Sequence, residues 1–321
     1  MLTQAVLVVA GLAILLVAGD LLVRGAVALA SALKIPTLII SLTIVAFGTS
    51  APELVVTVQA VIIGNDGIAL GNIIGSNIAN ILLVLGLPAI IYPVSTHVPG
   101  LRRHAFVMMI ATGAFAIAAY GPGEINTRIG WGLFASIILY VGYMSVRAMR
   151  GDYNEPVIDE VEEYLAEDKI SLKTIAFVAA GLIGLPLGAN LLVINGSALA
   201  AGLGVREELI GLTIIAFGTS LPELATVVAA AVHKKSDVAI GGIIGSNIFN
   251  IFAVGGAAGL AGTAIFEDAS RQLDIPVMIA STVLLAAFVF MRTDIARISG
   301  GAMAAAYFGF IYFLAITAGV V

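Results

Sequence analysis

Long apolar segments, separated by short polar ones, run along nearly the whole chain. Each apolar segment is continuous over about twenty residues or more, which predicts membrane-spanning helices and not the short alternating strands of a transmembrane barrel. Ten spans fit this pattern, five on either side of one long polar segment. The predicted spans are 2–30, 36–63, 68–92, 104–120, 126–148, 172–200, 207–232, 237–262, 274–291 and 297–319.

Two polar motifs inside these spans each occur twice, 170 residues apart. The first is Ala-Phe-Gly-Thr-Ser-x-Pro-Glu-Leu, at 46–54 and 216–224, and the second is Gly-x-Ile-Ile-Gly-Ser-Asn-Ile-x-Asn, at 71–80 and 241–250. Internal repeats in a membrane chain are typical of secondary transporters, which bind their substrates at the repeat interface. Because five spans per repeat is an odd number, the second repeat must enter the membrane in the opposite sense. We therefore predict an all-α integral membrane protein with ten transmembrane helices, arranged as two inverted five-helix repeats.

The repeats divide the chain into three sections. Residues 1–148 form the first repeat with spans one to five, and residues 172–321 form the second with spans six to ten. The section between them, 149–171, carries eight acidic residues and no basic one from Asp152 to Asp168. We interpret it as a solvated cytoplasmic linker, since it lacks the ligand spacing of an EF-hand calcium loop.

Composition and loop charge agree with a membrane protein. Hydrophobic residues make up 60% of the chain and charged residues only 11%, against roughly 25% charged residues in soluble domains. Eleven Lys and Arg residues fall in one set of loops, and the opposite set has only Arg128, Arg206 and Arg271. The positive-inside rule places the first set in the cytoplasm. We therefore expect both termini on the extracytoplasmic side of the cell membrane, plasma or inner.

One glutamate in each repeat lies near the middle of a predicted span. Burying an ionisable side chain there costs roughly 2.5–3.5 kcal/mol on insertion scales for Asp, Lys or Arg. Neither Glu53 nor Glu223 has a mid-span basic residue that could neutralise it. A bound cation or a proton is the remaining way to stabilise the pair.

Prolines next to these glutamates should interrupt the helices. Pro52 and Pro222 lack an N–H, so the carbonyls of Gly48 and Gly218 lose their helical partners. Interrupted backbone at membrane depth occurs where it lines a polar cavity, and its free carbonyls can coordinate cations. The hydroxyl groups beside these breaks are those of Thr49, Ser50, Thr219 and Ser220.

The second motif adds amides and hydroxyls. Ser76 and Asn80 are four residues apart and share a helix face, as do Ser246 and Asn250. We interpret these four as ligands, whereas Asn77 and Asn247 fit ligation and interhelical hydrogen bonding equally well. A set of oxygen atoms without sulfur or histidine suits a hard cation such as Ca²⁺ or Na⁺.

Together the doubled motifs resemble those of the calcium/cation antiporter superfamily, and in particular of the prokaryotic sodium/calcium exchangers. The resemblance covers the whole chain. It implies a secondary-active antiporter that exchanges cytoplasmic Ca²⁺ for external Na⁺ by alternating access at a mid-membrane site. It also implies that the first and sixth spans slide as a pair against the core formed by the other spans.

The resemblance further implies a ligand set. Ca²⁺ would bind Glu53 and Glu223 with the carbonyl oxygens of Thr49 and Thr219. Na⁺ would use these groups together with Ser50, Ser220, Ser76, Ser246, Asn80, Asn250 and the carbonyls of Ala46 and Ala216. One departure bears on stoichiometry, because family members can have Asp where this chain has Asn80 and Asn250.

Two alternatives stay open. An H⁺/Ca²⁺ antiporter would use the same oxygens, since both glutamates could titrate, although its branch of the superfamily carries a different motif. A cation channel is the alternative from another class, which the inverted repeat disfavours. No catalytic Ser/His pair, aspartate pair or zinc motif lies mid-span, so we expect no enzyme. We expect a monomer that requires no cofactor and no nucleic acid, with Ca²⁺, Na⁺ and the lipid bilayer as its partners.

Overall fold

The apolar segments fold into helices almost throughout the computed structural model, which describes residues 2–33, 35, 37–150, 170–202 and 218–317. Residues 151–169 of the predicted linker 149–171 lie outside the described residues. Eight of the described helices are long and apolar enough to span a membrane, or nine if one bent pair counts as a span. The protein is therefore a multi-span membrane protein, and its ten-span count stays a prediction.

The helices and strands follow one another closely along the chain. The first half contains α1 (Leu2–Leu33), α2 (Thr37–Ile40), α3 (Ala46–Thr49), α4 (Ala51–Ile62), α5 (Asp66–Ala79), α6 (Gly86–Ile91), α7 (Leu101–Tyr120), β1 (Glu124–Ile125) and α8 (Thr127–Arg150). The second half contains α9 (Leu172–Gly202), α12 (Leu221–Val232), α13 (Ser236–Phe249), α14 (Gly255–Ala261), β2 (Ala264–Ile265), α15 (Ile275–Met291) and α16 (Arg297–Thr317). The strands β1 and β2 pair antiparallel, with Glu124 opposite Ile265.

Four π-helical turns interrupt the helical pattern of the described residues, and the sequence did not predict them. They are Ser41–Val45, Asn80–Leu85, Asn250–Val254 and Ser270–Asp274. Two of them begin at Asn80 and Asn250, the last asparagine of the second motif in the first and the second repeat. Such π-turns occur frequently at functional sites.

The repeat is visible in the fold. Helices α4 and α12, and likewise α5 and α13, have the same lengths and boundaries displaced by the repeat offset. Repeat-equivalent residues also contact each other, since the Thr112 and Thr282 hydroxyls are 3.3 Å apart. The Asn247 amide likewise donates to the Asn77 carbonyl at 3.3 Å. Such contacts are expected where an approximate twofold axis relates two halves.

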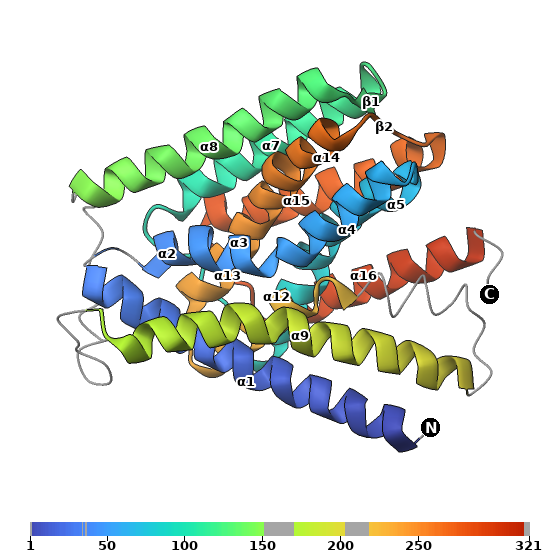
Figure 1. The fold of residues 1–321 in the computed structure, drawn as a ribbon. Coiled ribbons are helices and arrows are strands. Elements are labelled where there is room, and N and C mark those ends of the chain that lie inside the picture. Colours follow the sequence, from blue (N-terminus) through green and yellow to red (C-terminus); the bar gives the residue numbers. More distant parts are fainter. Residues whose placement is uncertain (1, 34, 36, 151–169, 203–217, 318–321) are drawn as a thin grey trace.

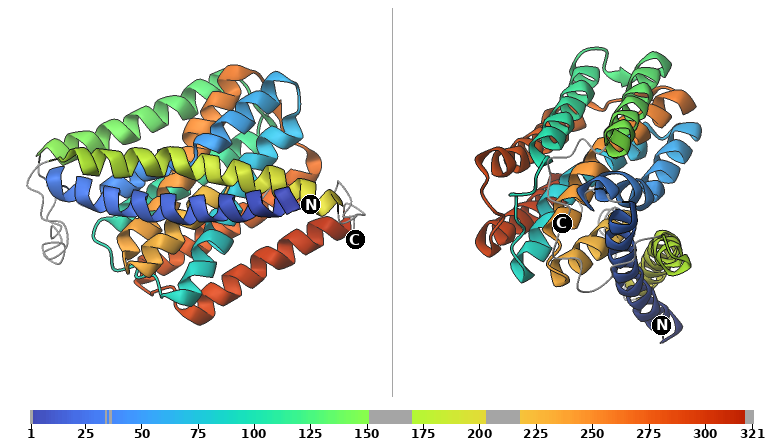
Figure 2. Two further views of the ribbon diagram at one scale, coloured as in Figure 1. Left: turned by 60° about the horizontal axis from the view of Figure 1, so that its bottom comes forward. Right: turned by 90° about the vertical axis from the view of Figure 1, so that its left-hand side faces the viewer.

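Helices α1 and α9 lie side by side along most of their lengths (Figure 1) and project from the other helices in the right-hand view of Figure 2. Gly181 and Gly188 of α9 allow this close packing, because a Cβ at either would come within 2.9 Å of α1 backbone atoms. Buried residues of α1 and α9 form a cluster together with residues of α2, the Ser41–Val45 turn and α12, and this cluster is distinct from the main core. That cluster contains Leu15, Ala18, Leu22, Leu185 and Ala189, among others.

A polar contact joins α1 to the corner between α12 and α13. Asp20 of α1 forms an ion pair with Arg24, with Nε 2.8 Å from the carboxylate, and it also contacts the ring nitrogen Nε2 of His233. Asn190 is the repeat equivalent of Asp20, and Ile63 is the equivalent of His233. Both of these are exposed. The contact therefore joins the two halves at this place and has no counterpart at the repeat-equivalent positions.

The connection between α15 and α16 is held against the one between α6 and α7. Val94 and Ile295 form an isolated antiparallel bridge, and the Asp294 carboxylate accepts hydrogen bonds from the Thr96 N–H and the Ser95 hydroxyl. Burial raises the pKa of Asp294, but hydrogen bonds from Thr96, His97 and Ser95 outweigh burial, so its pKa lies below the usual value. The carboxylate therefore stays charged and keeps these loops together at neutral pH.

Candidate functional site

The first motif breaks its helix at Ser50. Helix α3 ends at Thr49, α4 begins at Ala51 with Pro52 in its first turn, and the two segments are bent by 44°. The break is a single residue and not a longer unwound stretch, because the Ser50 N–H still donates to the Ala46 carbonyl at 3.0 Å. Ser220 has nearly the same backbone angles and precedes Pro222 in α12. Both prolines thus begin new helical segments, as their missing N–H allows.

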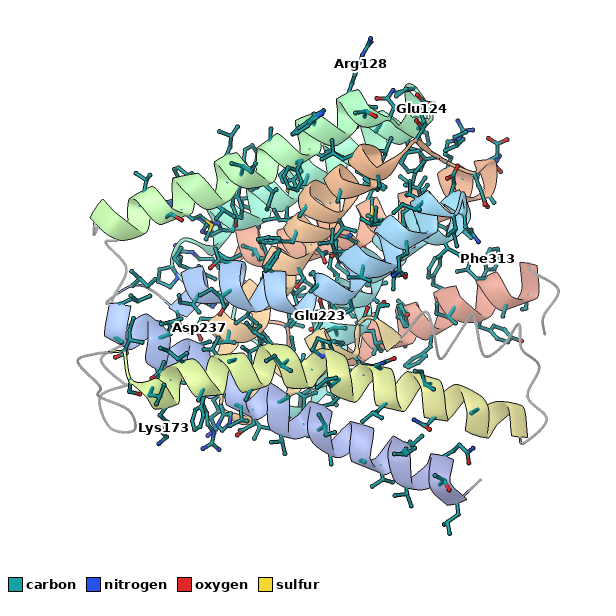
Figure 3. The ribbon with its side chains drawn as sticks, viewed as in Figure 1. Glu124, Arg128, Lys173, Glu223, Asp237 and Phe313 are labelled. Atoms are coloured by element: carbon teal, nitrogen blue, oxygen red, sulfur yellow. The ribbon has the colours of Figure 1, made fainter. Side chains whose placement is uncertain are left out.

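Both glutamates of the motif are buried in the first turns of α4 and α12. Glu53 is 1% exposed and Glu223 is 2% exposed, and Figure 3 places Glu223 near the middle of the molecule. The Ser50 hydroxyl, three residues before Glu53, lies 3.4 Å from Oε1 of Glu223, so the two glutamates meet in the same region. Within the described part of the chain neither forms a salt bridge. The two repeats therefore bring two unneutralised carboxylates together in the interior.

Hydroxyl groups of the first repeat face the glutamate of the second. Ser50 donates to Oε1 of Glu223 at 3.4 Å, and the hydroxyls of Thr49 and Ser246 also interact with this carboxylate. Thr49 and Ser246 are themselves 3.3 Å apart. The broken turn of one repeat thus meets α13 of the other.

The asparagines of the second motif form a chain across the repeat interface. The Asn80 amide donates to Oδ1 of Asn247 at 3.0 Å, and Asn247 donates in turn to the Asn77 carbonyl. Asn77 donates to the Ile73 carbonyl at 2.7 Å. Because Asn247 uses both ends of its amide in this chain, its role is interhelical hydrogen bonding.

Several buried oxygens in this region accept no hydrogen bond from any described residue. A buried polar atom without a partner costs roughly 1–3 kcal/mol, and in native proteins such an atom needs an explanation. Carboxylate, amide and hydroxyl oxygens are the donors that Ca²⁺ and Na⁺ prefer, so a cation among them would satisfy the set. The atoms are Oε2 of Glu53, Oε2 of Glu223, Oδ1 of Asn77, Oδ1 of Asn80, Oδ1 of Asn250 and Oγ of Ser220.

Fewer contacts link the other predicted ligands to the two carboxylates. Ser76 and Asn250 are buried, but no side-chain hydrogen bond links them to the cluster within the described residues. The Ala46 carbonyl already accepts two hydrogen bonds, from the Ser50 N–H and the Thr49 hydroxyl. It would have to lose one of them to bind an ion. Ala216 lies outside the described residues.

Asn72 touches this region, although the sequence did not single it out. Its amide nitrogen donates to the Glu53 carbonyl at 3.2 Å and to the Thr57 hydroxyl at 2.9 Å. Its repeat equivalent is Gly242, so the position varies between the two copies of the motif. Because Asn72 is not repeated, the duplicated motif gives no signal at this position.

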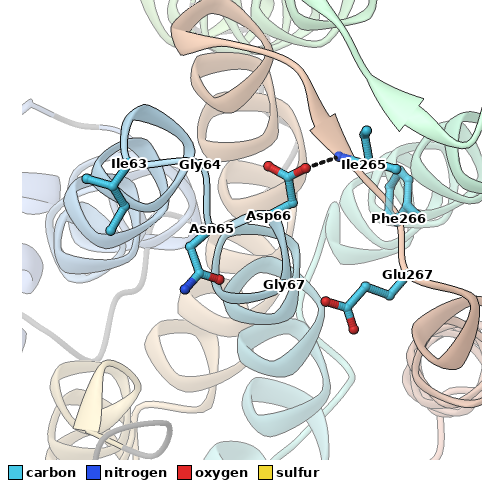
Figure 4. Close-up of a pocket in the computed structure, with 8 residues that line it drawn as sticks. All are labelled: Ile63, Gly64, Asn65, Asp66, Gly67, Ile265, Phe266 and Glu267. Carbon is cyan, nitrogen blue, oxygen red and sulfur yellow. Dashed lines mark hydrogen bonds between the residues drawn. The ribbon is translucent and has the colours of Figure 1, made fainter.

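A surface hollow of about 480 Å³ lies elsewhere, between the α4–α5 corner and β2 (Figure 4). Asp66, Glu267 and Phe266 line it, and the Asp66 carboxylate accepts a hydrogen bond from the Ile265 N–H at 3.1 Å. Its lining residue nearest to Glu53 in the sequence, Ile63, directly follows α4 and comes ten residues after Glu53, or about 15 Å along a helix. The hollow is therefore not part of the carboxylate cluster.

Known proteins share both the sequence pattern and the fold. The family model described as sodium/calcium exchanger protein matches residues 3–149 and 173–316. The inner membrane protein YrbG of Escherichia coli strain K12 is 34% identical over 296 residues, covering 91% of this chain and 90% of that protein. The sodium/calcium exchanger MaX1 of Methanosarcina acetivorans is 29% identical over 342 residues, covering 95% and 96%.

A solved structure agrees over the full length. The sodium-calcium exchanger NCX_Mj superimposes with a TM-score of 0.80 and 30% sequence identity, covering 98% of each chain. The family model reaches both predicted repeats and omits only the centre and the ends of the chain. This multi-span membrane protein therefore belongs to the sodium/calcium exchanger protein family, a family of antiporters.

Proposed function

We propose that this protein is an antiporter that moves Ca²⁺ out of the cytoplasm in exchange for external Na⁺. The observation that carries the proposal is the pair of buried carboxylates, one from each repeat, which have no basic partner among the described residues and are surrounded by unpartnered oxygens. Two carboxylates match the charge of one divalent cation. Protons or several Na⁺ ions could neutralise them in exchange.

Ca²⁺ binds between the two broken helices in this proposal. Its ligands are the carboxylates of Glu53 and Glu223 and the carbonyls of Thr49 and Thr219. Na⁺ ions use the same groups and the neighbouring hydroxyls and amides. These additional Na⁺ ligands are Ser50, Ser220, Ser76, Ser246, Asn80 and Asn250, with the carbonyls of Ala46 and Ala216.

The proposed cycle exposes this site to each side of the membrane in turn. Ten spans in two inverted repeats, 1–148 and 172–321, would supply two equivalent routes to one site. The close packing of α1 on α9 at Gly181 and Gly188 supports a cycle in which these two helices slide as a pair against the main core. We place both termini on the extracytoplasmic side of the cell membrane, as the loop charges predict.

A transport assay in proteoliposomes tests the proposal. Vesicles loaded with Na⁺, with K⁺ or with acid are diluted into a medium that contains Ca²⁺ and lacks the loaded ion. We expect saturable Ca²⁺ uptake from the Na⁺-loaded vesicles alone. Uptake driven only by the acid load would make the protein an H⁺/Ca²⁺ antiporter, and uptake without any counter-ion would make it a channel.

A further inference from the structure

We propose that Asn72 is a positioning residue for ion binding, which holds the first turn of α4 and thereby sets where the Glu53 carboxylate lies. The inference rests on the proposed function, because it assigns Glu53 to the transported ion. Asn72 itself does not touch the ion in this proposal. It acts through the backbone of Glu53 and through Thr219.

The contacts of Asn72 reach both broken helices. Its amide nitrogen donates to the Glu53 carbonyl at 3.2 Å and to the Thr57 hydroxyl at 2.9 Å, so it links α5 to the first turn of α4. Its amide oxygen accepts a hydrogen bond, at 3.5 Å, from the Thr219 hydroxyl of the second repeat. One side chain therefore joins the glutamate of the first repeat to the motif of the second.

The second repeat has no such link. Asn72 corresponds to Gly242, and Thr57 corresponds to Val227, at the repeat offset of 170 residues. The polar pair between α4 and α5 is thus replaced by a glycine and an apolar side chain between α12 and α13. A need for packing alone would not distinguish the two halves, since α4 and α5 have the same lengths as α12 and α13, with boundaries displaced by the repeat offset.

The two glutamates are consequently held in different ways. Glu53 is held through its backbone carbonyl by Asn72, whereas Glu223 is held through its carboxylate by Ser50. Both supporting groups belong to the first repeat. Because ion ligands must lie within a few tenths of an ångström of their productive positions, a shift of the first turn of α4 changes affinity for the ion.

The test compares variants by their Ca²⁺ concentration dependence. Purified wild-type protein, Asn72→Ala, Asn72→Gln and Thr57→Val are reconstituted, and Na⁺-driven Ca²⁺ uptake gives KM and the maximal rate. We expect Asn72→Ala to raise the KM for Ca²⁺ about five- to tenfold, as for a lost hydrogen bond to a ligand-bearing group, with a maximal rate close to that of the wild type. Thr57→Val, which leaves the bond to Glu53, should have a smaller effect, and Asn72→Gln should recover part of the affinity.

The matched control is Gly242→Ala. A Cβ at Gly242 meets no atom of the described residues within 4 Å, so this variant should keep the wild-type KM. If Asn72 only stabilised the fold, Asn72→Ala would instead give less active protein and a lower maximal rate, with the KM for Ca²⁺ unchanged. That result would overturn the inference.

A second measurement separates this inference from the proposed function. The Ca²⁺ affinity of each purified variant in detergent is obtained from the dependence of its unfolding temperature on Ca²⁺ concentration. If wild-type vesicles show no Na⁺-driven uptake, the proposed function fails, and these affinities still decide the role of Asn72. Equal affinities for wild-type protein and Asn72→Ala would overturn the positioning role whether or not Na⁺ drives transport.

Discussion

Glu53 and Glu223 lie in the interior with one unpartnered oxygen each, and no described basic side chain neutralises them. Folding alone would favour replacing them, because a buried carboxylate without a partner costs several kcal/mol. The ion binding that we propose would account for their presence in both repeats. The surrounding hydroxyls and amides are neutral, so these two side chains carry the whole fixed charge of the cluster.

Replacing either glutamate by glutamine should abolish Ca²⁺ transport. Glu53→Gln or Glu223→Gln removes half of this fixed charge while keeping the size of the side chain. We expect a loss of about 3 kcal/mol in ion binding, or about 100-fold, as for a buried ion pair that loses one member. Initial rates of Ca²⁺ uptake measure the effect, with the exposed Glu267→Gln as the control. Wild-type uptake in either variant would refute the assignment of these ligands.

A third carboxylate at Asn250 should change the response to pH. Asn250→Asp adds a titratable group beside the two glutamates, and a proton bound there competes with the cation. We expect reduced but measurable Ca²⁺ uptake that falls more steeply than in the wild type as pH is lowered. Asn65→Asp, which replaces an exposed helix-capping residue by another good cap, is the control. Identical pH profiles for wild type and Asn250→Asp would place this residue away from the ions.

At this scale the sequence predicted the residue types better than their contacts. The repeated letters identified Glu53, Glu223 and the surrounding oxygens, because a duplicated polar motif in an apolar chain is a strong signal. Asn72 was missed because it is not repeated. The two roles of Asn247 were left open, since only the fold shows that its amide is used at both ends.

At the level of elements, the prolines located the breaks in the helices but not their extent. The structure keeps most helical hydrogen bonds and interrupts α3 and α4 at one residue. The π-helical turns were not foreseen, because their apolar sequences resemble those of the adjoining α-helices. Such turns depend on how neighbouring helices pack, and the pattern of apolar positions does not encode that.

The contact between α1 and α12 offers a test at this scale. Asp20→Asn removes the charge that Arg24 and His233 share. We expect a loss of about 0.5–1 kcal/mol in stability, because the groups are partly exposed. Thermal unfolding of Asp20→Asn, His233→Gln and the double variant gives the coupling energy. Asn190→Ala, at the exposed repeat-equivalent position, is the control, and additive effects of the two substitutions would show that the contact contributes nothing.

For the whole molecule, the sequence predicted a multi-span helical membrane protein of the right family. The apolar segments agree with the described helices to within a few residues at most ends. Its orientation in the membrane rests on loop charges alone. In Figure 1 the N-terminal end of α1 and the C-terminal ends of α9 and α16 lie at the same end of the molecule. A fold by itself does not distinguish the inside of a cell from the outside.

Labelling of single cysteines tests the orientation directly, because the chain contains no cysteine. Thr127 and Thr293 are both exposed, one at the start of α8 and the other between α15 and α16. A membrane-impermeant maleimide added to intact cells should label Thr127→Cys, and should label Thr293→Cys only after lysis. The reverse pattern would invert the proposed topology, and with it the direction of Ca²⁺ movement.

In the proposed function, the two buried carboxylates also set the charge of the ion-loaded protein. Their combined charge of about −2 is cancelled by one Ca²⁺ or by two Na⁺, so either loaded form would cross the membrane as a neutral unit. Each further Na⁺ leaves one positive charge, which gains or loses about 2.3 kcal/mol per 100 mV of potential. Over a full cycle the net charge moved is the number of Na⁺ ions minus the two charges of Ca²⁺, whatever the fixed charge of the site, so the reversal potential reports that number.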